Sequence, residues 1–505
     1  MKIAIYQTSD IHGYVYPTNY VNDMPLGLLK IGTYIKADQS NYDASLKIDC
    51  GDLIQGSPFA NYLVNKKLDI NPIIEGMMHI GYDVYVLGNH EFNFGMDYLK
   101  NSYKPVYDKI INANINGLPF ETKPYKIFDF DGYKIGCIGL TTSYIPNWEQ
   151  PKNITGVSFE DPVAMYGKYE EELKDKCDFI IACYHGGFEK SLDEEMIPTE
   201  VLTKENQGSE LLETYSSIDM ILSGHQHRGF MTKLRDVVCM QPHHNGQNFS
   251  KVVLDTLTGK VEYELVQTSS VDTTIRHELE RIYTSIQDEL EIYLDQKIGH
   301  FSEAILLKDI FEARLKGHPF VNFMHNVQRM ESGADISVFS LFDGTIGFSK
   351  EVSVREVLIN YPYANTLKVL KLKGSKVKEA MEKSATYFVI QEDGKIGINP
   401  TFLYPKVQNY NYDMFGGVDY EIDLNRPFGE RITSLIINGE PMDMDKEYTV
   451  VLSNYRASNV SIYPAYEGAE VVKDITKDIS EMLIDYIQNT PCVEVDMYQN
   501  YIVNK

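Results

Sequence analysis

The sequence predicts an α/β protein built from more than one domain. Strand-like runs alternate with amphipathic helical stretches up to about residue 268, and this alternation is typical of a layered α/β domain. Polar residues suited to metal binding follow several of these runs, at the carboxyl ends of strands, where open α/β sheets place their sites. A chain of 505 residues also exceeds what one hydrophobic core usually serves.

The elements of the first domain are expected in a regular order. An apolar strand begins at the N-terminus, over residues 1–6. Amphipathic stretches predict helices over parts of 27–38, 59–79, 96–107, 162–175 and 206–216. Residues 251–254 and 261–265 are expected to form a hairpin that turns at Thr258-Gly259 and closes the domain.

A long amphipathic helix is expected to separate this domain from a second one. Apolar residues recur at spacings of three and four over about 273–298, with Asp272 or Thr273 as cap and Gly299 as stop. The predicted division is 1–268, a linker helix in 269–299, and 300–505. In the last part we expect strands at 335–342, 366–373, 431–437 and 447–453, and helices at 308–329, 374–388 and 473–488.

Composition limits the classes of partner. A net charge of −25 argues against binding to nucleic acid or to an anionic membrane, because such contacts need clustered Lys and Arg. An anionic substrate is still compatible, since bound divalent cations reverse the local sign. No apolar run reaches the ~20 residues of a membrane span, and no signal-peptide pattern precedes the first strand. We expect a cytoplasmic monomer, although a chain trimmed of its signal peptide would look the same. The six scattered cysteines lack zinc-ribbon spacing and are expected to be free, buried thiols.

Five segments place possible metal ligands directly after strands. They carry two Asp, one Asn and four to five His, and they are 7–13, 51–52, 88–91, 185 and 224–227. Each segment alone has a simpler explanation, such as a turn carboxylate or a packed histidine at a strand end. Five such coincidences are far less probable than one site. Oxygen and nitrogen ligands without thiolate suit manganese, which we expect, or zinc, iron or cobalt. Water held between two such ions has its pKa lowered enough to act as a nucleophile near neutral pH, so a hydrolytic centre of this kind needs no Ser or Cys nucleophile.

These motifs resemble the 5′-nucleotidase family of calcineurin-like metallophosphoesterases. The resemblance covers nearly the whole chain and depends most on Gly88-Asn89-His90-Glu91, because a neutral amide is an unusual ligand. It implies a four-layer α/β/β/α sandwich for the catalytic domain, then the linker helix and a smaller α/β substrate-binding domain. It also implies two divalent ions bridged by Asp52. The ligands would be Asp10, His12, Asp52 and His227 for the first ion, and Asp52, Asn89, His185 and His225 for the second.

His90 is implied to be catalytic without being a ligand. It would stabilise the transferring phosphoryl group or protonate the leaving oxygen, and the alternative is a purely structural role. Many nucleotidases of this family pair that histidine with an Asp three residues on, where this chain has Asn93. An Asn carbonyl can orient the imidazole but cannot supply charge. The string resembles the branch of 2′,3′-cyclic-nucleotide 2′-phosphodiesterase/3′-nucleotidases, which favours a cyclic substrate.

The C-terminal part resembles the family's substrate-binding domain, through residues 361–367, 373–374, 382–385 and 453–456. In that family two aromatic rings enclose the base, and stacking of this kind is worth ~1–3 kcal/mol per base. The candidates for substrate contact are Tyr412, Phe415, Asn454, Arg456 and Tyr463. With 36 Tyr and 22 Phe in the chain, a core position is the alternative for each ring.

Two further segments bear on the substrate. Family members often carry an arginine in the stretch that corresponds to 340–347, and this chain has none there. His243 and His244 are expected to lie in a polar loop rather than to line the site.

The sequence therefore predicts a dinuclear metal-dependent phosphoesterase acting on 2′,3′-cyclic nucleotides, nucleoside monophosphates or both. A 5′-nucleotidase or UDP-sugar hydrolase is the first alternative. A non-catalytic nucleotide or metal sensor is the second. The family precedent implies hinge rotation about the linker helix, with its end near Gly299 absorbing the backbone change.

Overall fold

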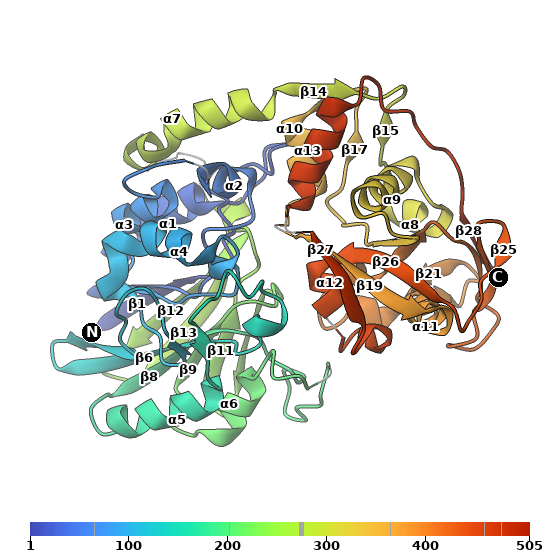
Figure 1. Ribbon diagram of the computed structural model, residues 1–505. Coiled ribbons are helices and arrows are strands. Elements are labelled where there is room, and N and C mark those ends of the chain that lie inside the picture. Colours follow the sequence, from blue (N-terminus) through green and yellow to red (C-terminus); the bar gives the residue numbers. More distant parts are fainter. Residues whose placement is uncertain (65, 201, 272–276, 364, 459, 476) are drawn as a thin grey trace. The chain divides into compact units, whose positions relative to one another are not determined.

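The computed structural model describes residues 1–505 except 65, 201, 272–276, 364, 459 and 476. The chain divides into two compact units, Met1–Leu290 and Glu291–Lys505, here called unit 1 and unit 2 (Figure 1). The division falls within α7 (His277–Leu294), so the segment expected as a linker contributes to both units.

Helix α7 ends earlier than the sequence predicted. Its expected caps, Asp272 and Thr273, lie outside the described residues. The predicted stop at Gly299 is wrong, because α7 ends at Leu294 and Gly299 lies in strand β14 (Lys297–His300). There Gly299 pairs with Val352 of β18 (Glu351–Ser353). The hinge expected near Gly299 stays a prediction.

Two sheets form the centre of unit 1. The first has the order β13-β12-β1-β2-β3, and β1 runs parallel to β2 and antiparallel to β12. Its strands are β1 (Lys2–Thr8), β2 (Ala44–Asp49), β3 (Val84–Tyr85), β12 (Asn248–Asp255) and β13 (Lys260–Gln267). Strands β12 and β13 pair as the predicted closing hairpin.

The second sheet has the order β10-β11-β9-β8-β6-β5, and β6, β8, β9 and β11 run parallel to one another. Its strands are β5 (Tyr125–Phe130), β6 (Tyr133–Thr141), β8 (Phe179–His185), β9 (Met220–Ser223), β10 (Phe230–Leu234) and β11 (Val237–Gln241). A separate short pair joins β4 (Ile115–Asn116) to β7 (Ser158–Phe159). The parallel strands deliver their carboxyl ends to one edge, as the sequence predicted.

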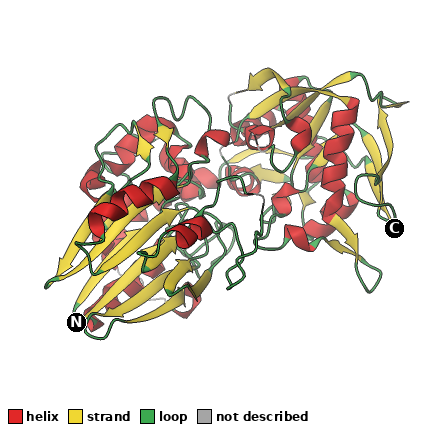
Figure 2. Cartoon of the chain, turned by 90° about the horizontal axis from the view of Figure 1, so that it is seen from below, coloured by secondary structure: helices red, strands yellow, loops and turns green. Residues whose placement is uncertain are grey.

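Alternating side chains build four layers from these sheets. Ile3 and Ile5 of β1 share one buried cluster with Ile181 and Cys183 of β8, so the two sheets pack face to face. Helices cover the outer faces, where the ring of Tyr34 in α1 (Leu28–Asp38) lies 5.2 Å from that of Phe249 in β12. Figure 2 shows the strands of unit 1 side by side with helices over them. The predicted α/β/β/α sandwich is confirmed.

The helices of unit 1 begin at recognisable signals. They are α1 (Leu28–Asp38), α2 (Pro58–Val64), α3 (Pro72–Ile80), α4 (Gly95–Tyr103), α5 (Pro162–Leu173) and α6 (Gly208–Thr214). Two helices, α2 and α3, lie in the stretch 59–79 where helix was expected. Pro72 occupies the first turn of α3, and the side chain of Asn71 accepts a hydrogen bond from the amide of Ile73.

Unit 2 is a second α/β body. Its largest sheet has the order β22-β16-β26-β19-β27, and a smaller one has the order β25-β24-β23-β28. The strands of these sheets are β16 (Ile336–Phe339), β19 (Leu367–Lys373), β22 (Met414–Gly416), β23 (Asp419–Asp423), β24 (Ile432–Ile437), β25 (Glu440–Pro441), β26 (Glu447–Ser453), β27 (Glu470–Ile475) and β28 (Tyr501–Asn504). Short pairs complete the unit, through β15 (Ile305–Leu306), β17 (Gly347–Phe348), β20 (Phe388–Ile390) and β21 (Ile396–Ile398).

The helices of unit 2 differ from expectation at two places. They are α8 (Ile310–Lys316), α9 (Pro319–Ser332), α10 (Val354–Asn360), α11 (Gly374–Ser384), α12 (Asn454–Ser458) and α13 (Ile479–Asn489). The helix predicted at 308–329 is two helices, because Gly317 has a φ of 78° and Pro319 cannot continue a helix. The helix predicted from 473 begins only at Ile479, after β27.

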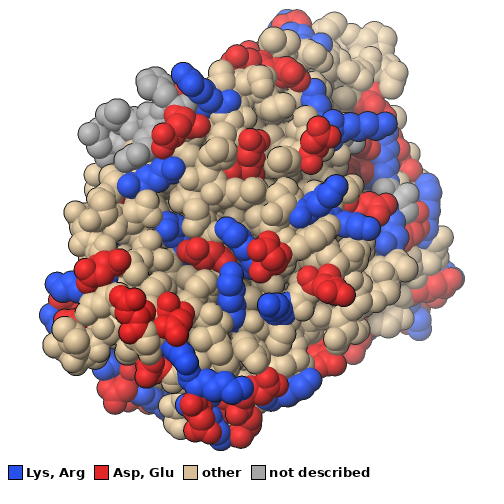
Figure 3. Space-filling view, turned by 90° about the vertical axis from the view of Figure 1, so that its left-hand side faces the viewer, with Lys and Arg blue, Asp and Glu red and all other residues tan. Residues whose placement is uncertain are grey.

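The surface agrees with the composition. In the part of the chain that the structure describes, no helix is long and apolar enough to cross a bilayer. Among the described residues on the face drawn in Figure 3, Lys and Arg are interspersed with Asp and Glu. All six cysteines are free, as predicted, and four of them are buried, but Cys177 and Cys492 are only half-buried. The cytoplasmic location and the monomeric state stay predictions.

Candidate metal centre

The strand ends of unit 1 bring six of the seven predicted ligands into two groups. Asp10, His12 and His227 form one group, and Asp52, His185 and His225 form the other. Within each group the ligand atoms lie within 4.8 Å of one another. Residues from both sheets meet in each group. The arrangement follows from the parallel strands β1, β2, β8 and β9, which end at the same edge.

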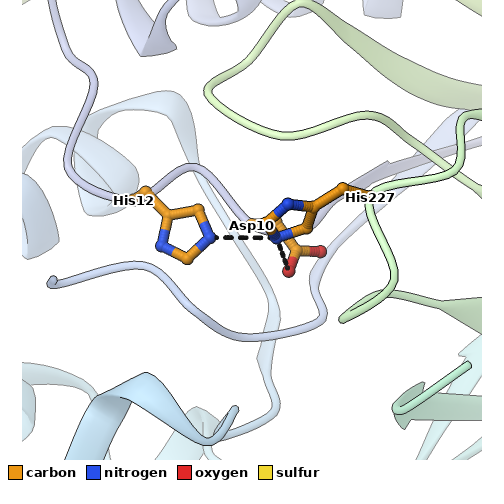
Figure 4. A group of neighbouring side chains, drawn as sticks. All are labelled: Asp10, His12 and His227. Carbon is orange, nitrogen blue, oxygen red and sulfur yellow. Dashed lines mark hydrogen bonds and ion pairs between the residues drawn. The ribbon is translucent and has the colours of Figure 1, made fainter. Parts of the chain in front are cut away.

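In the first group two imidazole nitrogens and a carboxylate oxygen converge (Figure 4). Nε2 of His12 lies 3.2 Å from Nε2 of His227, which lies 3.2 Å from Oδ1 of Asp10. Nδ1 of His12 is 3.0 Å from the carbonyl oxygen of Gln55. A carbonyl only accepts, so Nδ1 carries the hydrogen and Nε2 presents a lone pair to the group. The position between these two nitrogens and the carboxylate oxygen therefore suits a cation.

The second group contains the predicted amide ligand. Nε2 of His185 lies 3.3 Å from Oδ2 of Asp52 and 3.0 Å from Oδ1 of Asn89. Nδ1 of His225 lies 2.9 Å from the same amide oxygen. The far nitrogens are held by acceptors, His185 Nδ1 by the carbonyl of Cys50 at 2.6 Å and His225 Nε2 by Glu205 at 3.1 Å. Acceptors on the far nitrogen are the usual support of a metal-ligating histidine.

The electrostatics of the centre require positive charge. Burial opposes ionisation of Asp10 and Asp52, but the neighbouring His227 and His185 lower the pKa of each carboxyl below its usual range. Burial also acts on His185, yet the Asp52 carboxylate outweighs it and raises the His185 pKa to about 10. The two buried carboxylates thus favour positive charge beside them, whether from a protonated His185 or from a bound cation. Divalent ions fit this demand and the oxygen and nitrogen donor set.

The backbone is strained at the candidate ligands. Five of the seven have a positive φ, namely Asp10 (55°), His12 (51°), Asp52 (56°), His225 (73°) and His227 (56°). Such conformations are uncommon for residues other than glycine and cost on the order of 1–3 kcal/mol each. They persist at sites where the surrounding structure holds them, and they aim these side chains inward. The sequence carries no direct signal of them.

Glu91 joins two of the ligand loops and was not predicted. Its carboxylate is fully buried and accepts hydrogen bonds from the amides of Asp52 at 2.8 Å, Leu53 at 2.7 Å and Gly88 at 2.6 Å. The loops are very close here, because a Cβ on Gly88 would lie 2.3 Å from Oδ1 of Asp52. Glu91 therefore fixes the Asp52 and Asn89 loops against each other.

His90 lies beside the ligands and belongs to neither group. Its ring centroid is 5.3 Å from that of His12, and its Nδ1 is 2.7 Å from Oδ1 of Asn93. The pairing expected between His90 and Asn93 is therefore present. Beyond it, Nδ2 of Asn93 donates to Oε2 of Glu149 at 2.7 Å.

Two aromatic contacts at the centre were missed from the sequence. The ring of Trp148 stacks on His225 at a centroid distance of 5.3 Å. The ring of His244 stacks on His227 at 4.7 Å, so this part of the expected polar loop packs against a candidate ligand. Trp148 comes from a distant segment that nothing in the local sequence marks, whereas His244 was expected in a polar loop rather than at the site.

Comparison with known proteins identifies the family of this chain. The profile of the calcineurin-like phosphoesterase family matches residues 3–229, and the profile of the 5′-nucleotidase C-terminal domain matches residues 297–468. A Staphylococcus aureus protein, provisionally described as a 5′-nucleotidase and solved with α-ketoglutarate, is 38% identical, with a TM-score of 0.92 over 100% of both chains. The chain belongs to the 5′-nucleotidase family of calcineurin-like phosphoesterases.

Curated relatives in the 5′-nucleotidase family carry more specific names. The trifunctional nucleotide phosphoesterase protein YfkN of Bacillus subtilis is 27% identical over 96% of this chain, which spans 38% of the length of YfkN. The 2′,3′-cyclic-nucleotide 2′-phosphodiesterase/3′-nucleotidase of Salmonella typhimurium is 25% identical over 90% of this chain and 81% of that protein. The chain is thus an enzyme of the metallophosphoesterase class.

The predicted substrate residues of this family member lie inside unit 2. Tyr412, Phe415 and Tyr463 are each at most 2% exposed. Tyr412 stacks on Tyr387 at 4.6 Å, and the hydroxyl of Tyr463 donates to the carbonyl of Asn411 at 2.8 Å. In unit 2 these rings are parts of its core, and base stacking by any of them stays a prediction.

The two polar candidates are also held internally. Oδ1 of Asn454 accepts from the amide of Thr366 at 2.9 Å. Arg456 is 4% exposed and pairs with Asp413 at 2.9 Å. Its guanidinium also lies 4.7 Å from the centroid of the Tyr463 ring. A substrate role for Asn454 and Arg456 likewise stays a prediction.

Two arginines from other parts of unit 2 hydrogen-bond to the segment that lacks the family arginine. Nη2 of Arg314, in α8, donates to the carbonyl of Leu341 at 2.5 Å and to Oδ1 of Asp343 at 2.7 Å. Nη2 of Arg456 lies 3.4 Å from Oγ of Ser340. The segment 340–347 therefore has no arginine of its own but contacts two guanidinium groups, from Arg314 and Arg456. These contacts join positions distant in the sequence, so the local sequence could not reveal them.

Proposed function

We propose that this protein hydrolyses nucleotide phosphoesters with the help of two divalent metal ions. The observation that carries the proposal is the pair of ligand groups, Asp10-His12-His227 and Asp52-His185-His225, formed at one edge of the sandwich. When bound, the two ions would lower the pKa of a bound water, so that it attacks phosphorus as hydroxide near neutral pH. They would also neutralise the charge of the phosphoryl oxygens. Manganese is the expected ion, with zinc, iron or cobalt as alternatives.

The residues of the centre divide into ligands and a non-ligand. Asp10, His12 and His227 would hold one ion, and Asn89, His185 and His225 the other, with Asp52 between them. His90 would contact the phosphoryl group or hand a proton to the leaving oxygen through Nε2, because Nδ1 already bonds Asn93.

For the substrate we propose 2′,3′-cyclic nucleotides, nucleoside monophosphates or both. The relatives named as 2′,3′-cyclic-nucleotide 2′-phosphodiesterase/3′-nucleotidases support this choice, as does Asn93 in the place of an Asp. A 5′-nucleotidase or UDP-sugar hydrolase activity is the second candidate. The Staphylococcus aureus relative described as a 5′-nucleotidase favours it. A sensor without activity is disfavoured, since the ligands and His90 are all present.

We propose further that unit 2 recognises the nucleobase. The 5′-nucleotidase C-terminal profile matches residues 297–468, and this range contains every predicted substrate residue of unit 2. The catalytic role proposed for 1–268 and the substrate role proposed for 300–505 follow the two matched profiles.

A substrate panel tests these proposals. The protein, stripped of metal and reloaded separately with Mn²⁺, Zn²⁺, Fe²⁺ or Co²⁺, is assayed with 2′,3′-cAMP, 3′-AMP, 5′-AMP and a UDP-sugar. We expect phosphate release from 3′-AMP and ring opening of 2′,3′-cAMP. Turnover of 5′-AMP or the UDP-sugar alone would replace the first candidate with the second. No turnover of any nucleotide, or of p-nitrophenyl phosphate, with any of the metals would support the sensor.

A further inference from the structure

The loop of residues 148–153, here called the 148–153 loop, holds Asn93 from two sides. Oε2 of Glu149 accepts from Nδ2 of Asn93 at 2.7 Å. Nδ2 of Asn153 donates to the backbone carbonyl of Asn93 at 2.8 Å and to Oε1 of Glu149 at 2.8 Å. One loop thus fixes both the side chain and the backbone of Asn93, and its contacting residues follow Asn93 by 56 and 60 positions in the sequence.

Glu149 determines which way the Asn93 amide points. A carboxylate only accepts hydrogen bonds, and the side-chain partners of Glu149 described above are both amide donors. The NH2 group of Asn93 must therefore face Glu149, which turns Oδ1 of Asn93 toward His90. Because that oxygen also only accepts, Nδ1 of His90 carries a hydrogen, and Nε2 remains for the substrate.

We propose that Glu149 is a positioning residue for His90 and acts on it through Asn93. The family pattern has an Asp where this chain has Asn93, and the chain His90-Asn93-Glu149 places a carboxylate one side chain further out. A negative charge at Glu149 polarises the Asn93 amide and strengthens its bond to His90, as carboxylates behind ligating or catalytic histidines do. The inference rests on the proposed function, because it assumes that His90 serves phosphoester hydrolysis.

In that reaction the bonds change as follows. The oxygen of water forms a bond to phosphorus, and the bond from phosphorus to the leaving oxygen breaks with its electron pair on that oxygen. Nε2–H of His90 gives its proton to the leaving oxygen. The proton lost by the attacking water goes to solvent, from which His90 regains one. Glu149 and Asn93 exchange no atoms and only hold the imidazole in place.

The first test compares leaving groups. Glu149→Gln keeps the size of the side chain but offers an NH2 group that no longer dictates the Asn93 orientation. We expect kcat to fall about 10-fold on nucleotide esters and on phenyl phosphate, with KM and metal content unchanged. On p-nitrophenyl phosphate, whose leaving group needs little protonation, we expect less than about a twofold fall. The matched control is Glu160→Gln, which also loses a carboxylate–amide contact, to Asn116 at 3.0 Å, and should leave every rate unchanged.

The second test reverses the sign of the effect. In Asn93→Asp a carboxylate faces His90 directly, and its second oxygen meets the Glu149 carboxylate, so the two repel each other or share a proton that weakens the charge facing His90. Adding Glu149→Gln to that variant supplies a donor and removes the repulsion, so kcat should rise. A purely structural Glu149 predicts a fall, or no change, in both backgrounds. That result, or equal losses on phenyl and p-nitrophenyl phosphate, or loss of metal from Glu149→Gln, would overturn the proposal.

The aryl esters separate this inference from the proposed function. If the wild-type protein hydrolyses p-nitrophenyl and phenyl phosphate but no nucleotide, the substrate assignment fails. The ratio of the two aryl rates then still decides the role of Glu149.

Discussion

His90 differs from the four candidate histidine ligands because it belongs to neither ligand group, and its Nδ1 bonds the side chain of Asn93. We expect His90→Ala to keep both metal ions and to lower kcat by about 10²–10⁴-fold, the usual contribution of a general acid or base. Metal content by mass spectrometry and kcat with 3′-AMP or 2′,3′-cAMP give the two readouts. His79→Ala, on the exposed face of α3, serves as control. Loss of metal from His90→Ala would show that His90 is a ligand.

Glu91 offers a second prediction at the residue scale. In Glu91→Gln either amide orientation sets an NH2 group against backbone N–H donors that now bond the carboxylate, from Asp52, Leu53 and Gly88. We expect a loss of about 1–3 kcal/mol in the free energy of unfolding, because buried donors lose their partners. Metal affinity should fall as well, since the Asp52 and Asn89 loops are no longer held together.

Urea unfolding and metal titration measure these two effects. Glu121→Gln, an exposed carboxylate of the same unit, is the control and should change neither quantity. An unfolding free energy equal to that of the wild type would mean that Glu91 does not fix the loops.

At the scale of elements, helix α9 carries a buried histidine that couples the stability of unit 2 to pH. His325 is 4% exposed, its Nδ1 lies 3.0 Å from Oγ of Ser337 in β16, and burial and Arg329 lower its pKa to about 3. Below pH 6.5 this histidine binds a proton in the unfolded chain, where its pKa is near 6.5, but not in the folded chain, where its pKa is lower. Stability therefore falls as pH drops from about 6.5 toward 3, by up to about 1.4 kcal/mol per pH unit from this group.

The comparison with His325→Gln isolates that contribution. Glutamine keeps a donor toward Ser337 but cannot take up the proton, so its unfolding free energy should fall less steeply between pH 6.5 and 4. Chemical denaturation at each pH gives the difference between the two proteins. Parallel pH profiles would contradict the expectation, because the other titrating groups are common to both.

The elements also show which sequence signals were sufficient. Strand ends followed by Asp, Asn or His predicted the ligand groups, because parallel strands always present their carboxyl ends at one edge. Asn71-Pro72 and Gly317-His318-Pro319 were visible signals for helix boundaries, and the helix predicted at 308–329 ignored the second of them. In both cases the residues at the boundary, rather than packing against distant segments, determine where one helix ends and the next begins.

At the scale of the whole molecule, the features beyond sequence reasoning depend on contacts between distant segments. Asn93 meets Glu149, and Arg314 reaches Asp343, only after the chain has folded. The positive φ values at the ligands depend on loops that are packed closely against one another. At Gly88, for example, an added Cβ would lie 2.3 Å from Oδ1 of Asp52. The aromatic candidates of unit 2 were chosen by motif, but their burial depends on neighbours such as Tyr387, which no motif named.

The distribution of ligands over the molecule leads to a prediction about metal removal. All seven candidate ligands lie in unit 1, as does Trp148, the one tryptophan of the sequence, whose ring stacks on His225. Tryptophan fluorescence therefore follows unit 1 alone, whereas far-UV circular dichroism follows both units. We expect chelation to lower the Tm seen by fluorescence, because an ion present at 100 times its Kd stabilises the folded state by about 2.7 kcal/mol.

The part of the dichroism change that belongs to unit 2 should keep its Tm under the same treatment. Asp52→Ala, which removes a ligand from the second group, should largely abolish the metal-dependent shift in fluorescence Tm. A metal-dependent shift confined to the unit 2 transition would contradict the placement of both ions, because no candidate ligand of either group lies in Glu291–Lys505 among the described residues. Mn²⁺ should also change the emission of Trp148 in the folded protein before any unfolding, since the proposed ligand His225 would bind the ion while its ring is stacked on the indole.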